Sequence, residues 1–283
     1  MDVRNSPPGA SAPPELGAVR RAFEPVGGAD EIHWEADGHA VGTFHRARLS
    51  SVFQPIVDLR THEVVAHEAL IRCHKGNDLS PWGLFSLASD PQNLVSLDRL
   101  CRTVHALNYF AAAGATARLH LNIHTSLLET VPTDHGRVFS HILACLGVGP
   151  ERVVVEFHES ANRAPDLLKG AALNFCRRGF GLCLSYGGEK YPWLRALPVP
   201  EGTLIRIVPG RLAGGVALDS LVEACRRHGF VPLLHHVETA GDRARAIAAG
   251  ARLGQGFLFG RPDKLPGHNL PVLPEAGLIP AAD

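Results

Sequence analysis

Short apolar segments alternate with amphipathic ones along most of the chain after residue 50. Eight segments have the length and composition of strands: 51–57, 64–71, 117–123, 152–157, 181–185, 203–208, 231–236 and 251–257. Between most of them, apolar residues recur with a period near 3.6, as in NLVSLDRLCRTVHALNYFAAAG, which is typical of helices that bury one face. This alternation predicts an α/β domain with a largely parallel sheet.

The connections between these segments indicate how the sheet is built. Only DLRTHE separates the first two predicted strands, which suits an antiparallel hairpin and is too short for a crossover. The later connections fit parallel βα units. Eight strands with this rhythm predict a closed (β/α)8 TIM-like barrel with an antiparallel first strand. An open, doubly wound sheet is the alternative, but no glycine-rich phosphate loop follows any strand.

The chain divides into four predicted regions. Residues 1–30, rich in Pro, Ala and Gly, are expected to form a flexible leader. In residues 31–50 the pair Asp37-Gly38 separates two alternating runs, which predicts a short β-hairpin extension. The barrel is expected over 51–264, and 265–283 is a C-terminal tail.

Composition narrows the classes of partner and the compartment. Lys+Arg and Asp+Glu number 28 each, so no net charge attracts nucleic acid or an anionic membrane. No apolar run is long enough to span a bilayer, and the N-terminus lacks the apolar core of a signal peptide. The six cysteines form no CxxC pair, which favours buried thiols over disulfides or zinc ligands. We therefore expect a cytoplasmic protein with no membrane span and no nucleic-acid partner.

Polar residues stand at the ends of most predicted strands, where α/β barrels carry their active sites. They are Glu68, Asn122, Glu156, Ser185, Arg206, His235 and Gln255. Taken singly, each can be a residue that satisfies buried backbone groups. Taken in order, Glu, Asn and Glu supply the oxygen ligands that Mg²⁺ and Mn²⁺ prefer.

Several motifs in this order resemble the EAL domain family, whose active members are cyclic-di-GMP phosphodiesterases. VFQPIVDLRTHEVVAHEALIR contains the signature Glu68-Ala69-Leu70, LNIHTSLL resembles the family's Asn-bearing strand end, and VVVEFHES is similar to its ExxE motif. LPVPEGTLIRI, LLHHVETAGDRARAIAAG and ARLGQGFLFGRP follow in the family order. The resemblance covers roughly residues 45–264 and implies an EAL-type barrel.

The resemblance also implies roles for individual residues. The implied metal ligands are Glu68, Asn122 and Glu156. The implied contacts to the dinucleotide are Gln54, Glu68, Leu70, Arg72, Gln255, Gly256 and Phe257. Of the family's AEGVE motif, the second glutamate is retained as Glu238. Active members hold two Mg²⁺ or Mn²⁺ ions, which clamp the attacking and leaving oxygens.

The departures from the family pattern lie in the metal site. Ser185 and Tyr186 stand where active members carry two consecutive aspartates, and the loop after them is about three residues short. Arg206 replaces a lysine, and His235 replaces the first glutamate of AEGVE. A hydroxyl and a phenol supply no negative charge to a pair of cations at neutral pH. His235 could instead ligate a softer ion such as Zn²⁺.

We therefore predict a degenerate EAL protein of cyclic-di-GMP signalling that binds the dinucleotide, a protein partner or both, with no cofactor and no confident catalytic residue. Two alternatives stay open. One is an active cyclic-di-GMP phosphodiesterase with an altered Mg²⁺ or Mn²⁺ site, and the other is a protein-interaction module that binds no nucleotide. Retention of Gln54, Glu68, Arg72 and Gln255 favours nucleotide binding.

Overall fold

The computed structural model describes residues 32–88, 90–112, 115–131, 134–186, 199–212 and 216–264, with Gly17, Val19 and Pro266. The predicted leader (1–30) and tail (265–283) otherwise lie outside the described residues, as does most of the shortened loop after Tyr186. The domain boundaries stay predictions.

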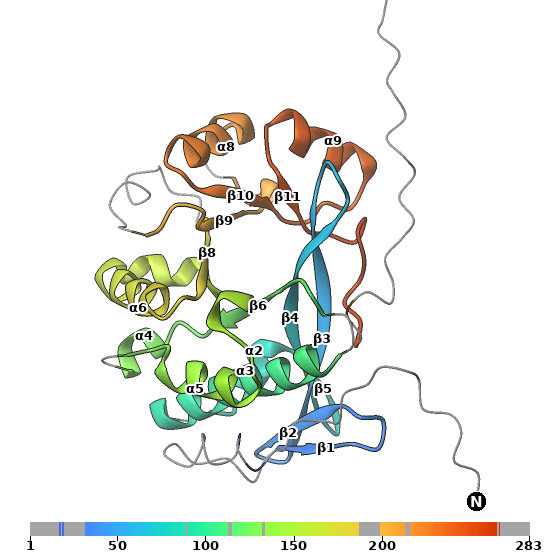
Figure 1. Ribbon diagram of the computed structural model, residues 1–283, viewed down its shortest axis with the longest axis vertical. Coiled ribbons are helices and arrows are strands. Elements are labelled where there is room, and N and C mark those ends of the chain that lie inside the picture. The colour runs from blue at the N-terminus through green and yellow to red at the C-terminus, as the bar shows by residue number, and fades with distance from the viewer. Residues whose placement is uncertain are drawn as a thin grey trace, which may run out of the picture.

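Eight strands of the described chain close into a barrel, which confirms the predicted fold (Figure 1). They are β3 (Ala47–Asp58), β4 (Val64–Lys75), β6 (Arg118–Ile123), β7 (Val153–Phe157), β8 (Gly181–Ser185), β9 (Leu204–Ile207), β10 (Val231–Leu234) and β11 (Leu253–Gly254). Strands β4 and β6 to β11 run parallel to their neighbours in the order of the chain, whereas β3 runs antiparallel to both β4 and β11. The pair Val57 and Gly254 closes the ring.

Three further strands extend the sheet beyond the barrel. The hairpin β1 (Ile32–Trp34) and β2 (Ala40–Phe44) pairs onto the start of β3, and β5 (Asn77–Leu79) folds back on the end of β4. Gly38 in the β1–β2 turn has φ +80°, a conformation that glycine adopts without strain. The Asp37-Gly38 turn therefore lies where the sequence predicts it.

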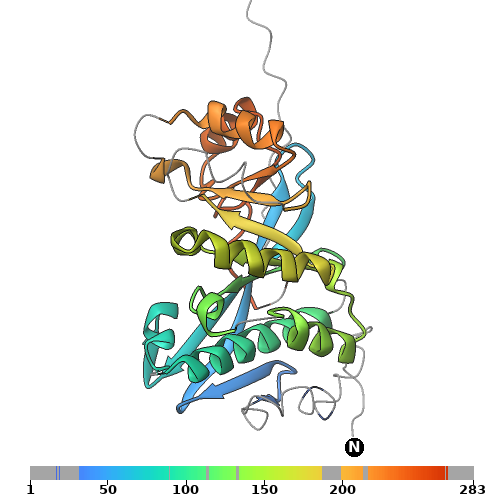
Figure 2. The same ribbon diagram turned by 90° about the vertical axis from the view of Figure 1, so that its left-hand side faces the viewer.

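Helices cover the outside of the strand ring (Figures 1 and 2). They are α2 (Pro81–Phe85), α3 (Pro91–Ala111), α4 (Leu127–Thr130), α5 (Arg137–Cys145), α6 (Pro165–Arg177), α8 (Leu218–Arg227) and α9 (Ala240–Ala248). Short 3₁₀ turns cover Pro150–Arg152, Glu159–Arg163 and Pro209–Arg211. Local sequence fixes several helix ends: Asp90 caps α3 by accepting from the Asn93 N–H at 2.9 Å, and Thr239 forms a capping box with Asp242 at the start of α9.

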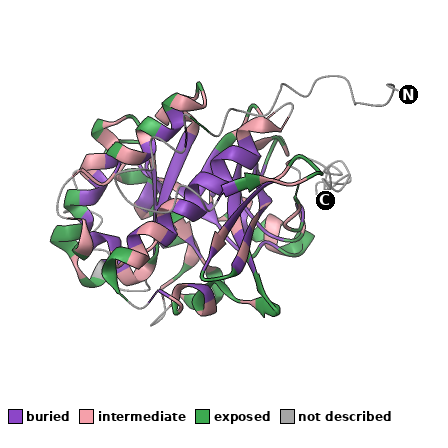
Figure 3. Cartoon of the chain, turned by 90° about the horizontal axis from the view of Figure 1, so that it is seen from below, coloured by how far each residue is buried: buried purple, intermediate pink, exposed green. Residues whose placement is uncertain are grey.

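The barrel separates two apolar layers. The larger lies between the strands and the helices, and the smaller fills the barrel interior. Figure 3 shows that the strands are buried along most of their length. The interior layer contains Ile56, Ala66, Val154, Cys183, Leu204, Leu233 and Leu253. Both faces of these strands are thus buried, which explains why they read as nearly continuous apolar runs in the sequence. Farther along each strand the inward positions become polar, and there the candidate site lies.

All six cysteines are free thiols, and Cys73, Cys101, Cys183 and Cys225 are buried. No helix in the described part of the chain is long and apolar enough to cross a membrane.

Two buried histidines lie between the barrel and α3. His67 bonds through Nδ1 to the Tyr109 hydroxyl at 3.0 Å, and His105 bonds through Nδ1 to Ser51 Oγ at 2.8 Å. Burial lowers the pKa of His67 to about 4 and that of His105 to about 3, from an ordinary value of 6.5. Both are neutral in the folded protein and take up protons when it unfolds below pH 6.5.

The stability that these histidines confer is present above pH 6.5 and is lost as the pH falls towards their folded pKa values. Each contributes a slope of about 1.4 kcal/mol per pH unit in that window. We expect His67→Phe to reduce the pH dependence of the free energy of unfolding by about that amount between pH 6 and pH 4.5. Tyr109 keeps an acceptor in the Ala117 carbonyl, 3.2 Å away. Urea unfolding at several pH values measures the slope, and His33→Phe on exposed β1 should leave it unchanged.

Candidate functional site

The inward-facing polar residues meet at the carboxyl ends of the parallel strands. Glu68 lies on β4, Glu156 on β7 and Arg206 on β9. Asn122 is paired in register with Glu156, and Ser185 with Arg206. Their neighbours His235 and Gln255 follow β10 and β11 directly. The structure therefore brings together all seven strand-end residues that the sequence singles out.

Arg206 lies at the centre of this ring. Its Nη1 donates to Glu156 Oε1 at 2.5 Å and lies 3.7 Å from Glu68 Oε1. Its Nη2 donates to His235 Nε2 at 2.8 Å. Because a guanidinium only donates, His235 accepts this bond as a neutral imidazole. One cation thus contacts both buried carboxylates and uses the imidazole nitrogen with which His235 would bind an ion.

The two carboxylates also bond to uncharged neighbours. Glu68 accepts from Asn122 Nδ2 at 3.0 Å and from Gln255 Nε2 at 2.8 Å. Glu156 accepts from Ser185 Oγ at 3.2 Å. Gln255 Nε2 also approaches Gln54 Oε1 at 3.4 Å. These hydrogen bonds use the Asn122 and Gln255 amides as donors to Glu68.

Charge is not fully balanced in this network. Burial alone would raise the pKa of Glu68, but the charge of Arg206 and the bond from Asn122 hold that pKa below its ordinary value. Burial raises the pKa of Glu156, and Arg206 offsets this only in part because it faces two carboxylates. Burial and the nearby Arg206 lower the pKa of His235 to about 3. The carboxylates together carry one negative charge more than Arg206 neutralises.

Two hollows adjoin the ring and share His158 in their walls. One has a volume of about 170 Å³ and is lined by His158, Glu159, Ser185, Tyr186, Arg206, Val208, Arg211 and His236. The other, of about 230 Å³, is lined by Pro81, Trp82, Phe85, Asn122, Ile123, His124, Thr125, His158 and Ser160. Trp82 is 84% exposed at its rim. Tyr186 is buried and lines the same hollow as Arg206.

The predicted dinucleotide contacts differ in how accessible they are. Arg72 is exposed on β4, and its Nη1 bonds to the Ile71 carbonyl at 3.1 Å. Leu70 is half-buried and Gln54 is buried. Phe257 is 45% exposed, and the Arg261 guanidinium lies over its ring, 4.1 Å from the centroid.

Gly256 has a packing requirement of its own. A Cβ at this position would lie 2.0 Å from the Val237 carbonyl oxygen, which excludes any larger residue.

The two remaining glutamates of the family motifs lie at the edge of the site. Glu238 is exposed just before α9, where its N–H bonds to Asp242 Oδ2 at 3.2 Å. Glu159 lies 3.6 Å from Arg211 Nη1 at the edge of the smaller hollow.

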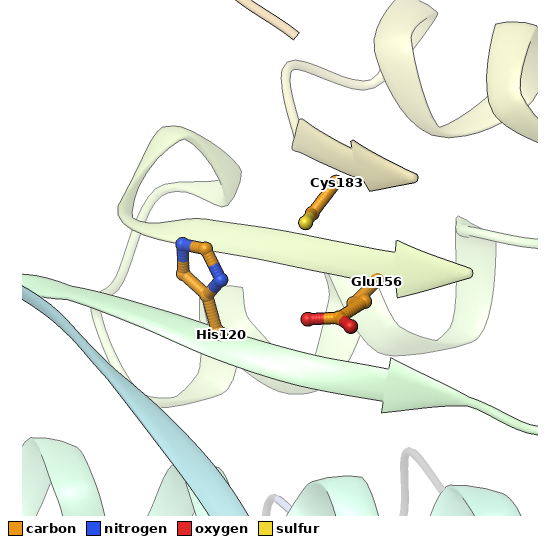
Figure 4. A group of neighbouring side chains, drawn as sticks. All are labelled: His120, Glu156 and Cys183. Atoms are coloured by element: carbon orange, nitrogen blue, oxygen red, sulfur yellow. The ribbon is translucent and has the colours of Figure 1, made fainter. Parts of the chain in front are cut away.

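Sequence reasoning did not single out His120 and Cys183. Both lie on inward positions two residues before Asn122 and Ser185, beside Glu156 (Figure 4). The alternation of β-strand side chains, counted back from the strand ends, would have identified these positions.

Comparison with known proteins places the chain in a family. The EAL domain model matches residues 39–262, so the chain belongs to the EAL domain family. No curated protein sequence matches it.

Solved structures of EAL proteins share the fold. The EAL enzyme Bd1971 in its cAMP-bound form is 14% identical, with a TM-score of 0.64 over 76% of this chain; the match spans 63% of Bd1971. A standalone EAL protein from Vibrio cholerae O395, bound to c-di-GMP, is 23% identical, with a TM-score of 0.62 over 77% of this chain and 93% of that one. The c-di-GMP-bound EAL domain of FimX from Pseudomonas aeruginosa is 19% identical, with a TM-score of 0.64 over 76% and 91%.

Removing the central cation tests how the ring is held together. We expect Arg206→Ala to lower the free energy of unfolding by about 3–5 kcal/mol near pH 7, because two buried carboxylates then lack a charged partner. The loss should shrink as the pH is lowered, because protonation of a carboxyl removes the unpaired buried charge. Chemical denaturation at a series of pH values measures it.

Arg227→Ala is the matched control for this substitution. The side chains of Arg227 and Glu223 are 69% and 54% exposed and lie 3.7 Å apart, and exposed pairs contribute about 1 kcal/mol or less. Equal losses in the two variants would contradict a central role for Arg206.

Proposed function

We propose that this chain is a catalytically degenerate EAL-domain protein that regulates by binding cyclic di-GMP rather than by hydrolysing it. The observation that carries the proposal is the guanidinium of Arg206 between Glu68 and Glu156. In the family pattern, these carboxylates are metal ligands. In this chain, the guanidinium of Arg206, which is covalently part of the protein and cannot leave the site, contacts both carboxylates.

The remaining donors do not fit a pair of Mg²⁺ or Mn²⁺ ions. Two divalent cations a few ångströms apart need anionic ligands to offset their repulsion. Ser185 and Tyr186 supply no anionic ligand, and the Ser185 hydroxyl donates a hydrogen bond to Glu156. His235 accepts from Arg206 and is not available to a metal in this arrangement. Arg206 cannot act as a base in place of the family's lysine, because it stays protonated.

The shape and charge near the ring support a nucleotide ligand. Small-molecule sites usually have volumes of about 300 Å³ or more, so neither hollow alone suits a dinucleotide. Because the two hollows share His158, one extended ligand can occupy both. Trp82 offers an exposed indole on which a base can stack. The relatives solved with c-di-GMP favour this ligand over other dinucleotides.

Arg72 is the side chain best suited to bind a phosphate. It is exposed, it bonds to a backbone carbonyl, and no carboxylate of the described residues pairs with it. A guanidinium can bind two phosphate oxygens at once. Arg206 is less suited, since its charge is shared between two carboxylates. A protein partner then recognises the nucleotide-bound form of the barrel. The exposed rim around Trp82 is a candidate surface for that partner.

We expect the purified protein to form no linear dinucleotide from cyclic di-GMP with Mg²⁺ or Mn²⁺. Chromatography of long incubations with an active EAL phosphodiesterase as positive control measures this. Product formation by pure protein that stops on addition of a chelator would overturn the proposal.

We expect cyclic di-GMP to bind with the same dissociation constant in Mg²⁺ and in chelator. Arg72→Ala should weaken binding roughly 10- to 100-fold, because it removes a charge-assisted contact of about 1.5–3 kcal/mol. Isothermal titration calorimetry measures both effects. Arg60→Ala is the matched control, since Arg60 is an exposed arginine on the β3–β4 connection and should leave binding unchanged.

Each other outcome points to one alternative. A dissociation constant that tightens strongly with Mg²⁺ would favour the altered phosphodiesterase. No binding in either buffer would favour a protein-interaction module.

A further inference from the structure

Below the ring of polar residues, three potential metal ligands converge inside the barrel. They are His120 on β6, Glu156 on β7 and Cys183 on β8 (Figure 4). One ligand atom from each lies within 4.8 Å of the others, and all three residues are buried. No other group of three or more His, Cys, Asp or Glu ligands converges in this way within the described residues.

One nitrogen of the buried His120 ring lacks a hydrogen-bond partner. His120 is 2% exposed, and its Nδ1 has no hydrogen-bond partner. Figure 4 shows this ring with a nitrogen turned towards the Glu156 carboxylate and the Cys183 sulfur. A buried polar atom without a partner costs about 1–3 kcal/mol, so its position calls for an explanation. A bound ion would supply one.

We propose that His120, Glu156 and Cys183 bind a single Zn²⁺ ion. Imidazole nitrogen, thiolate sulfur and carboxylate oxygen are the ligands that zinc takes up in proteins, and a thiolate disfavours Mg²⁺. Tetrahedral zinc with ordinary bond lengths places its ligand atoms about 3.3–3.7 Å apart. Separations of at most 4.8 Å must therefore shorten by no more than about 1–1.5 Å, which side-chain rotation can achieve.

The charges of the network agree with a divalent ion at this position. When both carboxyls are ionised, Glu68 and Glu156 contribute two negative charges against the single positive charge of Arg206, which leaves an excess negative charge in a buried space. Zinc displaces the proton of the Cys183 thiol, which is hydrogen-bonded to Glu156. Two carboxylates, one thiolate, one guanidinium and one divalent cation then sum to zero.

The zinc site is compatible with the ion pair above it. The bonds of Glu156 to Arg206 and Ser185 both reach Oε1, so Oε2 can contact the ion. Ser185 faces the same side of β8 as Cys183 and lines the hollow of about 170 Å³, which offers an entry path and a fourth, water ligand.

Titration of the metal-free, full-length protein with Co²⁺ under reducing conditions tests the site. We expect one Co²⁺ per chain, a thiolate-to-cobalt charge-transfer band in the near ultraviolet, and displacement of that band by Zn²⁺. Cys183→Ser should abolish the band. His120→Gln should weaken binding by at least 10- to 100-fold, which is about the loss caused by removing an outer-shell partner. The control Cys225→Ser changes an equally buried cysteine and should keep the band.

X-ray absorption of the zinc-loaded parent gives a second measurement that requires no variant to fold. One sulfur among nitrogen or oxygen neighbours supports the proposal, whereas no sulfur, or two or more, would overturn it. Absence of the cobalt band in the parent, or its persistence in Cys183→Ser, would do the same. Because none of these measurements uses cyclic di-GMP, the outcome is independent of the nucleotide proposal.

Discussion

The contact of one guanidinium with two buried carboxylates governs the chemistry of this barrel. Glu68 and Glu156 are each about 3% exposed, so without a cation they would bear the full cost of desolvation. Arg206 provides that cation from within the chain. The other polar groups are arranged around it: Asn122 and Gln255 donate to Glu68, Ser185 donates to Glu156, and His235 accepts from Arg206. Most polar groups of the ring thus find partners within the ring, and of its central residues only Arg206 Nε and His235 Nδ1 are buried without a hydrogen-bond partner.

The ion pair of Arg206 with the two glutamates suits ligand binding better than catalysis. A fixed guanidinium offers charge and directional hydrogen bonds, but it polarises no water and accepts no proton. The features proposed for recognition are the two hollows beside the ring, the exposed Trp82 and the exposed Arg72. In the proposed function, the barrel keeps the shape that its family uses for a dinucleotide while its centre holds a static ion pair.

The sequence was sufficient to predict the barrel and the ring because both depend on simple periodicities. Strand spacing predicted the eight strands and the antiparallel β3, and the rule that barrels place polar residues at strand ends selected Glu68, Asn122 and Glu156. The ion pair was not predictable in the same way. Arg206 and Glu156 are 50 positions apart, and whether their side chains meet depends on rotamers and on the stagger of the closed barrel. His120 and Cys183 were missed because the residues on either side of each, Leu119 and Leu121 on β6 and Leu182 and Leu184 on β8, are buried and apolar, which hides the inward positions.

Closure of the ring also has a consequence for biosynthesis. The end of strand β3 finds its partner only in β11, where Val57 meets Gly254, and Phe53 pairs still later with Asp263. At ribosomal rates of about 5–20 residues per second, roughly 10–40 seconds separate the synthesis of these two segments. Until β11 leaves the ribosome, one edge of β3 stays open to pairing with other chains. Its other edge is already paired with β4, and β2 covers its first residues. The long β3–β4 hairpin with its β1–β2 extension is therefore suited to act as a cotranslational nucleus, on which the parallel strands add one by one until the barrel closes.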